Sequence, residues 1–164
     1  MGWLFGYSSR RLLIEHLTRP YTTAELTQKC LARYCSGNNL WVVFEQCRKD
    51  REPTRFIGLF LMRNSKDGWG YKDLSESMGP YEVTCPLSFL AMAPPANPEW
   101  RESVRAYHRR VRQKLKVGDS IRLTNGQFYT VVETAPLVGS DAQGVRWRIP
   151  RRMLTLPDEA SPVL

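Results

Sequence analysis

Long apolar runs are absent from this chain of 164 residues. The longest apolar stretches, at 56–62 and 86–93, are far shorter than the roughly 20 residues that a membrane-spanning helix needs. The first residues also lack the basic segment, the long apolar core and the small-residue cleavage site of a secretion signal. The sequence therefore predicts a cytoplasmic protein that does not enter a membrane.

Metal-binding and cofactor-binding patterns are missing as well. No close cysteine pair, no histidine pair and no glycine-rich loop with nucleotide-binding spacing before a helix is present. We therefore expect no metal and no cofactor. In a chain long enough to form a core without disulfides, the cysteines are expected to be reduced and buried. The cysteines and histidines are Cys30, Cys35, Cys47, Cys85, His16 and His108.

Acidic residues are scarce relative to basic ones. The chain has 16 Asp and Glu against 24 Lys and Arg, which gives a formal net charge of +8. Residues 97–152 alone contain twelve basic and five acidic residues, so this third of the chain carries +7 of that charge. Such an excess favours a polyanionic partner, above all nucleic acid or a nucleoprotein.

Arginine dominates this basic region, and arginine is suited to bidentate phosphate contacts and to stacking on bases. The alternative interpretation is a solvated helix face whose charges pair with acidic residues of the same protein. A recognition helix of the helix-turn-helix type is disfavoured, because prolines interrupt the segment 93–98 before the helix. The predicted nucleic-acid contacts are Arg101, Arg105, Arg109, Arg110, Arg112, Lys114, Arg146, Arg148, Arg151 and Arg152.

The spacing of apolar and capping residues predicts an α+β fold with two N-terminal helices, a central antiparallel sheet and a long basic helix. Consecutive apolar residues after position 40 indicate a central strand that is covered on both faces. The expected elements are helices at 8–18, 22–35, 86–92 and 98–115 and strands at 40–47, 55–63, 81–85, 120–123, 128–133 and 145–149.

The last strands predict a small β module similar to an SH3 barrel. Asn125-Gly126 between two alternating runs is typical of a hairpin turn, and a loop is expected at 139–144. Several short strands in about forty residues can form so small a module only if it packs on the rest of the chain. The expected division is an α+β body at 1–96, a basic amphipathic helix at 97–116, the β module at 117–157 and a flexible tail at 158–164.

The stretch 64–80 is rich in glycine, charge and aromatic residues. Glycines on both sides of Trp69 allow sharp turns, and Trp69 and Tyr71 alternate onto one side, which predicts a partner-binding loop. Alternatively, both aromatics are core residues of a strand and either Asp73 or Ser75 caps a helical turn. A cation site is disfavoured, because lysines lie among the carboxylates. The loop residues concerned are Lys66, Asp67, Trp69, Tyr71, Lys72, Asp73 and Glu76.

A longer signature runs through this part of the chain. Gly70-Tyr71-Lys72-Asp73 is followed by Glu76-Ser77-Met78-Gly79-Pro80 and Cys85-Pro86, and the chain opens with Met1-Gly2-Trp3. With Glu99-Trp100-Arg101, this signature resembles a family of small uncharacterised proteins of bacteria, plasmids and phages. The resemblance covers most of the chain and brings no activity, cofactor or catalytic residue. It implies a mobile-element setting, in which small proteins often act on host defence or on nucleic acid.

Three functions follow from these patterns, in this order. The first is binding of nucleic acid or a nucleoprotein, without catalysis, through the arginine-rich face. The second is inhibition of a host defence system, of the anti-CRISPR or anti-restriction type, by a protein contact through Trp69 and Tyr71. The third is a small enzyme that uses Cys85 or the carboxylates of Asp73 and Glu76. We expect a protein that is not an enzyme.

Overall fold

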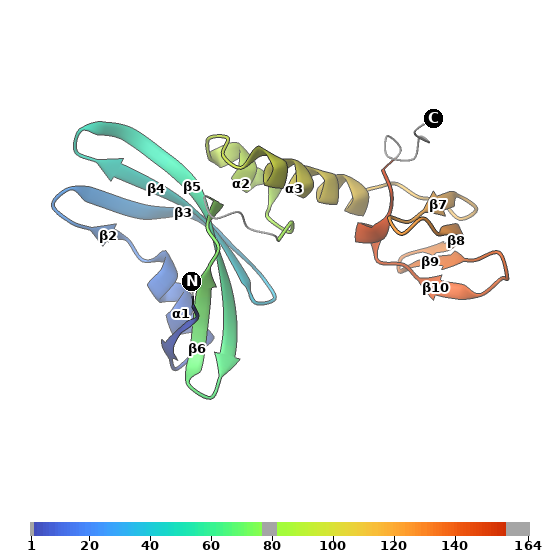
Figure 1. Cartoon of the computed structure of the whole chain (residues 1–164), viewed down its shortest axis with the longest axis horizontal. Coiled ribbons are helices and arrows are strands. Elements are labelled where there is room, and N and C mark those ends of the chain that lie inside the picture. The colour runs from blue at the N-terminus through green and yellow to red at the C-terminus, as the bar shows by residue number, and fades with distance from the viewer. Residues whose placement is uncertain (1, 77–81, 157–164) are drawn as a thin grey trace. The chain divides into compact units, whose positions relative to one another are not determined.

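The computed structural model describes residues 2–76 and 82–156 and divides the chain into two compact units, Met1–Val104 and Arg105–Leu164. Strands hold 45% of the residues and helices 22%. The protein is therefore mainly β, and the expectation of an α+β fold with two N-terminal helices and a long basic helix is wrong. Each unit has a sheet of its own (Figure 1). Each unit also has apolar clusters of its own.

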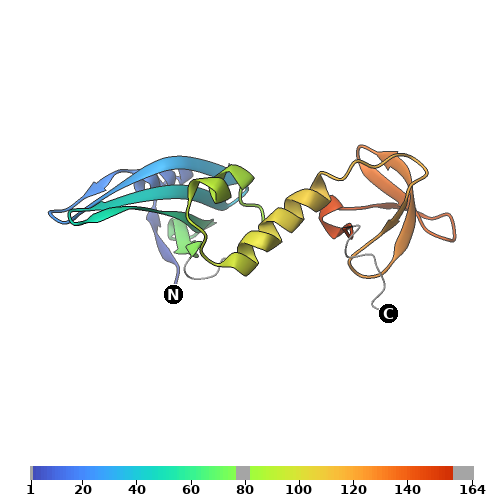
Figure 2. The same ribbon diagram turned by 90° about the horizontal axis from the view of Figure 1, so that it is seen from above.

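A six-stranded antiparallel sheet forms the first unit. Its strands are β1 (Leu4–Tyr7), β2 (Tyr21–Thr22), β3 (Leu26–Ser36), β4 (Asn39–Arg48), β5 (Arg51–Ser65) and β6 (Gly68–Asp73). The strand order is β1-β6-β5-β4-β3-β2, so β3 to β6 form a meander and β1 closes one edge. The long strands β3, β4 and β5 run side by side and bend together (Figures 1 and 2).

The central strand β4 is buried on both faces. Leu40, Val42 and Phe44 pack into one apolar cluster, whereas Trp41 and Val43 pack into another. Because side chains alternate along a strand, these two clusters lie on opposite faces of the sheet. The expectation of a doubly covered central strand is confirmed.

Helix α1 (Arg10–Thr18) covers one face of the sheet. Ser9 caps it, because the Ser9 hydroxyl oxygen accepts a hydrogen bond from the Leu12 backbone N–H at 3.2 Å. Leu13 is fully buried among the β4 and β5 side chains of that face. The helix expected at 8–18 is therefore present.

The opposite face is covered by α2 (Leu87–Met92) and by the first turns of α3 (Pro98–Val111). Trp100 of α3 stacks on Trp41 of β4, with ring centroids 5.8 Å apart. The Trp100 indole N–H donates to the Glu82 carbonyl oxygen at 2.8 Å, so the segment before α2 is held to the same helix. This contact anchors the start of α3 in the core of the first unit.

The apolar pattern of β4 ends at Glu45, which is buried between two basic side chains. Lys29 on β3 and Arg55 on β5 lie opposite Glu45 in the sheet register. Lys29 Nζ is 2.6 Å from Glu45 Oε1, and Arg55 Nε is 2.8 Å from Oε2. Hydrogen bonds from Lys29 and Arg55 hold the pKa of the Glu45 carboxyl below its ordinary value.

The helix expected at 22–35 is wrong, because that segment is strand β3. β3 pairs with β4 from Leu26, opposite Arg48, to Ser36, opposite Asn39. Gly37 has φ 58° in the short turn between the two strands. The glycine and asparagine signal at this point therefore marks a hairpin turn and not the end of a helix.

A bulge explains why β3 resembles a helix in sequence. The register of β3 against β4 shifts between Cys30 and Ala32, so the strict alternation of inward and outward residues is interrupted there. Cys30 packs toward the α1 face, whereas Leu31 and Ala32 pack toward the face of α2 and α3. The resulting apolar spacing of four and five residues from Leu26 imitates a helical period.

A four-stranded antiparallel sheet forms the second unit, in the order β10-β9-β8-β7. The hairpin expected at Asn125-Gly126 is confirmed, because Arg122 pairs with Phe128 across it. Ile121 and Val131 point into a separate apolar core. The strands are β7 (Ser120–Arg122), β8 (Phe128–Thr134), β9 (Leu137–Ser140) and β10 (Arg146–Arg148).

Three other expectations need correction. α3 has 14 residues and ends at Val111, before the expected end at Leu115. Residues 82–85, the described part of the strand expected at 81–85, do not form a strand. β9 occupies the start of the loop expected at 139–144. The expected tail at 158–164 lies outside the described residues.

Candidate nucleic-acid interface

Positive charge is concentrated in the second unit. Residues 105–164 contain eleven Lys and Arg against five Asp and Glu, a formal charge of +6. Residues 1–104 contain thirteen basic and eleven acidic residues, a formal charge of only +2. An anionic ligand is therefore attracted mainly to the second unit.

One face of the four-stranded sheet presents part of this charge. Paired residues on neighbouring strands share a face of a sheet, and so do residues two apart in one strand. The pairs Arg122–Phe128, Thr130–Ser140 and Ser140–Arg146 place their side chains on the face away from the core. This outer face comprises Ser120, Arg122, Phe128, Thr130, Glu133, Val138, Ser140, Arg146 and Arg148.

The outer face combines guanidinium groups with an exposed aromatic ring. Phe128 is 64% exposed, and the guanidinium carbon of Arg122 lies 5.7 Å from the centre of its ring. Arg146 Nη1 is 3.9 Å from Glu133 Oε1, and both side chains are more than half exposed, so this ion pair holds Arg146 weakly. Arginines for phosphates and an aromatic ring for bases are the side chains that nucleic-acid-binding sheets use.

A groove of about 400 Å³ opens at the β7 edge of this face. Arg122 and Phe128 line it together with Gln113, Leu115 and Thr155. The Gln113 side-chain amide donates to the Thr155 carbonyl at 3.1 Å, and the Thr155 N–H donates to the Arg122 carbonyl at 2.9 Å. These hydrogen bonds fix the walls of the groove.

The basic residues expected on the long helix occupy different environments. Arg105 and Arg109 are exposed on α3, and Arg110 is half-buried. Arg112 and Lys114 are exposed in the segment after α3. All five belong to the second unit and add to its positive charge.

Arg101 is buried in the first unit and is not a surface contact. Its side chain is only 2% exposed and forms an ion pair with Glu76, which is 3% exposed. Arg101 Nε donates to Glu76 Oε1 at 2.7 Å, and Nη2 donates to the same oxygen. The prediction that Arg101 contacts nucleic acid and the prediction that Glu76 lies on a docking loop therefore lose their structural support.

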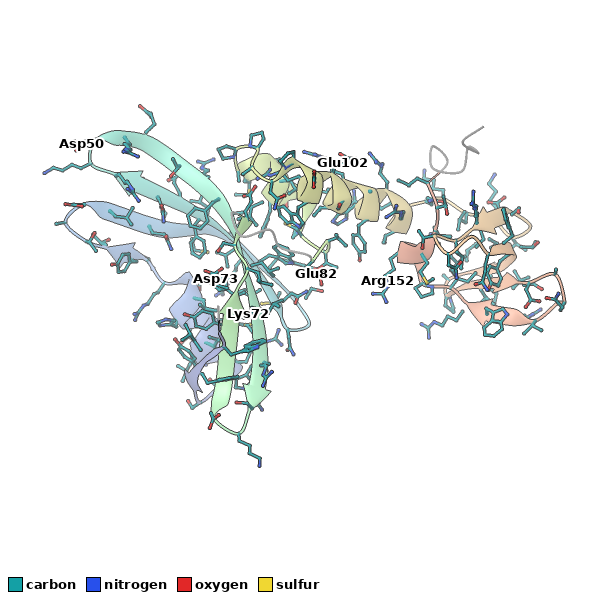
Figure 3. All side chains as sticks on the ribbon, in the orientation of Figure 1. Asp50, Lys72, Asp73, Glu82, Glu102 and Arg152 are labelled. Atoms are coloured by element: carbon teal, nitrogen blue, oxygen red, sulfur yellow. The ribbon has the colours of Figure 1, made fainter. Side chains whose placement is uncertain are left out.

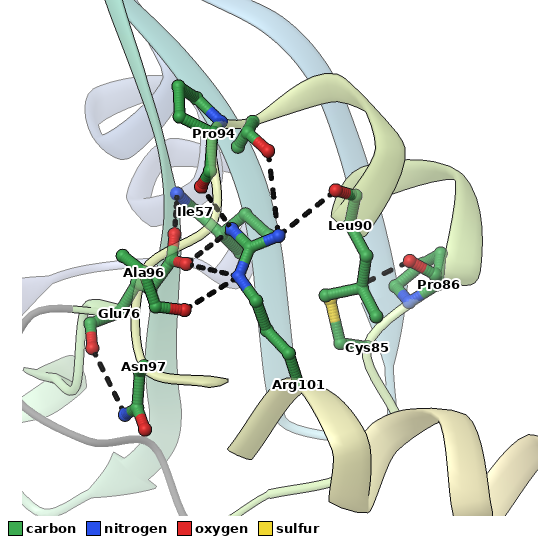
Figure 4. A network of polar contacts seen from close by, with 10 residues as sticks. Ile57, Glu76, Cys85, Pro86, Leu90, Pro94, Ala96, Asn97 and Arg101 are labelled. Atoms are coloured by element: carbon green, nitrogen blue, oxygen red, sulfur yellow. Dashed lines mark hydrogen bonds and ion pairs between the residues drawn. The ribbon is translucent and has the colours of Figure 1, made fainter. Parts of the chain in front are cut away.

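Backbone carbonyls take up the remaining hydrogen-bonding capacity of Arg101 (Figure 4). Its guanidinium donates to the Ala96 carbonyl at 2.7 Å, the Pro94 carbonyl at 2.9 Å and the Leu90 carbonyl at 3.0 Å. Glu76 Oε2 accepts the Ile57 N–H of β5 at 3.2 Å. The pair therefore ties the connection between α2 and α3 to the sheet.

The final basic segment divides into structural and exposed residues. Arg151 donates to the Gln113 carbonyl at 2.8 Å and to the Thr134 carbonyl at 3.1 Å, so its guanidinium holds two segments of the second unit together. Arg152 is exposed in the short 3₁₀ helix Arg151–Met153 (Figure 3). Arg148, like Arg152, is exposed and can contact a ligand.

The predicted binding loop is largely a strand. Trp69 and Tyr71 lie in β6, and both are partly buried against the cluster that α1 covers. Tyr71 meets the Phe60 ring edge-on, with centroids 5.7 Å apart. The alternative interpretation, in which these aromatics are core residues of a strand, agrees with the structure.

The charged residues around β6 are separated from one another. Lys66 and Asp67 are exposed in the turn between β5 and β6. Lys72 and Asp73 lie at the other end of β6 (Figure 3), where Asp73 Oδ1 accepts the Ser75 N–H at 2.8 Å. Residues 77–80 of the expected loop lie outside the described residues.

Cys85 has the environment of a structural thiol. It is fully buried, and burial raises the pKa of the thiol to about 12. Because the thiolate is the nucleophilic form, a thiol that stays protonated at neutral pH is a weak nucleophile. Asp73 and Glu76, the carboxylates named for catalysis, are engaged by Ser75 and Arg101. These contacts do not favour the enzyme hypothesis.

We expect thiol reagents to separate the cysteines of the folded protein. Cys35 is exposed, whereas Cys85 is buried and its pKa is raised to about 12. At pH 8, Cys35 should react within minutes and Cys85 only after unfolding in urea. Mass spectrometry of iodoacetamide-treated protein measures this difference, with the unfolded chain as the control. Fast labelling of Cys85 in the folded protein would restore it as a candidate nucleophile.

The structure offers no metal site and no membrane helix in the part of the chain that it describes. Among residues 2–76 and 82–156, no three His, Cys, Asp or Glu side chains come close enough to hold a metal ion. No helix in those residues is both long and apolar enough to span a bilayer.

The sequence analysis missed two residues of the outer face. The sequence places Arg122 in the basic region but not among the predicted contacts, and it places Phe128 only at the start of a predicted strand. Their signal is the alternation of Ser120 with Arg122 and of Phe128 with Thr130, which places polar or exposed side chains at every second position. A lone phenylalanine in such a pattern is read as a core residue unless the register is known.

The signature residues that the structure describes lie in the first unit and not at the outer face. Glu76 and Arg101 form the buried pair, Cys85 lies beside them (Figure 4), and Trp100 packs on the sheet. These signature residues therefore stabilise the packing of the first unit. Comparisons of the chain with protein-family models, with curated proteins and with solved structures give no match.

Proposed function

We propose that the protein binds nucleic acid, alone or in a nucleoprotein, through its second unit. The observation that carries the proposal is the outer face, where Arg122, Arg146 and Arg148 share one sheet surface with the exposed ring of Phe128. The formal charge of +6 in residues 105–164 supports it. No catalytic step is part of this proposal.

The spacing of the outer face suits a strand of phosphates. Neighbouring β-strands lie about 4.8 Å apart, so β7 and β10 are separated by roughly 14–15 Å across the sheet. Arg122 on β7 and Arg146 on β10 therefore lie two to three nucleotides apart along a bound strand. The hydroxyl groups of Thr130 and Ser140, which lie between them, can donate to the same backbone.

Electrostatic binding of this kind releases counterions and weakens with salt. Each neutralised phosphate contributes about 0.7–0.9 to the slope of log K against log salt. We expect Arg146→Ala with Arg148→Ala to lower this slope by about 1.4–1.8 and to weaken binding at low salt by roughly tenfold or more. Fluorescence anisotropy with a labelled oligonucleotide at several salt concentrations measures both quantities.

The matched control removes two arginines from the first unit. Arg48 and Arg51 are exposed and face each other near the tip of the hairpin between β4 and β5. Arg48→Ala with Arg51→Ala changes the net charge by the same amount and should lower the slope far less. Equal effects of the two double variants, or no binding of the unaltered protein at low salt, would contradict the proposal.

The defence-inhibitor function, and the setting and location predicted from the sequence, stay predictions. Inhibition of a host defence protein through Trp69 and Tyr71 has less support, because both rings are partly buried in the core. The mobile-element setting and the cytoplasmic location are supported by the sequence alone. Capture of a protein partner that survives nuclease treatment would favour the inhibitor hypothesis over the one proposed here.

A further inference from the structure

The groove at the β7 edge has the size and the lining of a small ligand site. Its volume of about 400 Å³ lies within the range of roughly 300–1,000 Å³ that is typical of such sites. Leu115 and Ile121 provide an apolar floor, and Ser120, Asp119 and Gln113 provide polar groups. The groove is therefore neither purely apolar nor a simple patch of charge.

Phe128 is the unusual residue of this groove. Ile121 and Leu154, which also line the groove, are buried in the core of the second unit, yet the Phe128 ring is exposed. Arg122 lies over that ring. A flat aromatic ring beside a guanidinium group offers a stacking surface to a planar ligand.

Thr155, another residue that lines the groove, has a buried polar side-chain atom without a partner among the described residues. The Thr155 hydroxyl oxygen is buried and makes no hydrogen bond to the described residues. The Thr155 backbone, in contrast, is bonded on both sides, to Gln113 and to Arg122. A buried hydroxyl that lacks a partner costs about 1–3 kcal/mol, and a ligand that hydrogen-bonds to it recovers that cost.

We propose that this groove receives one unpaired base of a single-stranded nucleic acid. The base stacks on Phe128 beside Arg122, and its edge faces the polar groups of Ser120, Asp119 and Thr155. The backbone then crosses the outer face toward Arg146. This inference rests on the proposed function and adds that the ligand is a single strand and not a duplex.

A duplex does not fit the same arrangement. Both faces of a base inside a duplex are covered by its neighbours, so the base must leave the stack before it can lie on Phe128. Leaving the stack costs a few kcal/mol in a duplex and little in a single strand. Duplex binding therefore uses only the phosphate contacts and does not depend on Phe128.

The test compares one labelled 12-nucleotide strand with the same strand annealed to its complement. Anisotropy at low salt should show tighter binding of the single strand. Phe128→Ala should weaken single-strand binding by roughly 5- to 150-fold, the loss expected for one stacked base, and leave duplex binding unchanged. Phe128→Trp should retain the single-strand affinity, because the indole ring also stacks.

The control variant is Tyr34→Ala, which removes an exposed aromatic ring of the first unit and should change neither affinity. Equal affinity for the two forms, or a Phe128→Ala variant that binds single strands like the unaltered protein, would overturn the base site and leave the proposed function intact. Failure of the unaltered protein to bind either form at low salt would overturn both. Circular dichroism shows whether each variant is folded.

Discussion

Replacing Glu76 by alanine is expected to lower the free energy of unfolding of the first unit by roughly 3–5 kcal/mol. The change leaves the Arg101 guanidinium, only 2% exposed, without its counter-charge. It also removes the acceptor of the Ile57 N–H. A buried charge without a partner is far more costly than a missing surface pair, because water cannot solvate it. Urea unfolding followed by tryptophan fluorescence measures the loss.

An exposed ion pair supplies the control for this variant. Arg11 and Glu15 form an i, i+4 pair on α1 at 2.9 Å, and both side chains are at least half exposed. Glu15→Ala should cost less than about 0.5 kcal/mol. If Glu76→Ala were no more destabilising than Glu15→Ala, the buried pair would not be holding the connection between α2 and α3.

A double-mutant cycle separates the energy of the Glu76–Arg101 ion pair from the energy of the other contacts that these two side chains make. Arg101→Met removes the charge but leaves the carbonyls of Leu90, Pro94 and Ala96 without their donor. The combined Glu76→Ala and Arg101→Met variant should be less destabilised than the sum of the single variants, since neither change then leaves an unpaired charge. The difference from additivity measures the coupling between the two side chains.

Local sequence signals predict the structure correctly where neighbouring residues determine it. The serine pair at positions 8 and 9 marks the start of α1, Asn125-Gly126 marks the β7–β8 hairpin, and the unbroken apolar run of β4 indicates burial on both faces. Each of these signals depends on residues within one element or one turn. The structure agrees with the sequence at all three places.

The sequence pattern predicts the wrong element where pairing with a distant segment determines the structure, as in β3. The spacing of Leu26, Cys30 and Leu31 fits a helix, yet the segment pairs with β4 over its full length. The bulge in β3 accommodates that spacing within a strand, and the spacing alone does not distinguish a bulged strand from a helix. The sheet gives this segment backbone partners along β4 and, at Thr27 and Gln28, also on β2, which outweighs its local preference.

In the candidate site, too, the sequence alone does not show which charged side chains are buried and which are exposed. Arg101 and Arg105 are one helical turn apart and look alike in sequence, yet Arg101 is buried on Glu76 and Arg105 is exposed. The partner of Arg101 is 25 residues earlier in the chain. Arg122 and Phe128 meet because of the hairpin register. Net charge thus indicates which part of the chain is basic, and only the fold shows which of its arginines are exposed.

The indole of Trp100 joins the signature segment, the sheet and the start of α3. Trp100→Ala is expected to lower the free energy of unfolding of the first unit by roughly 3–5 kcal/mol. The ring is 6% exposed and stacks on Trp41, and its N–H donates to the Glu82 carbonyl at 2.8 Å. Truncation therefore leaves a cavity against Trp41 and a carbonyl without its donor. Urea unfolding measured by far-UV circular dichroism, which does not depend on the lost fluorophore, gives the change.

Two further variants distinguish packing at Trp100 from a general effect of losing a tryptophan. Trp100→Phe keeps a ring against Trp41 but removes the hydrogen bond to Glu82, so its cost should be intermediate. Trp147→Ala removes an indole that is 51% exposed in the second unit and should cost less than about 1 kcal/mol. Equal losses for Trp100→Ala and Trp147→Ala would mean that the contact with Trp41 does not stabilise the first unit. In that case the Arg101–Glu76 pair and the buried Val104 would be the main contacts that hold the start of α3.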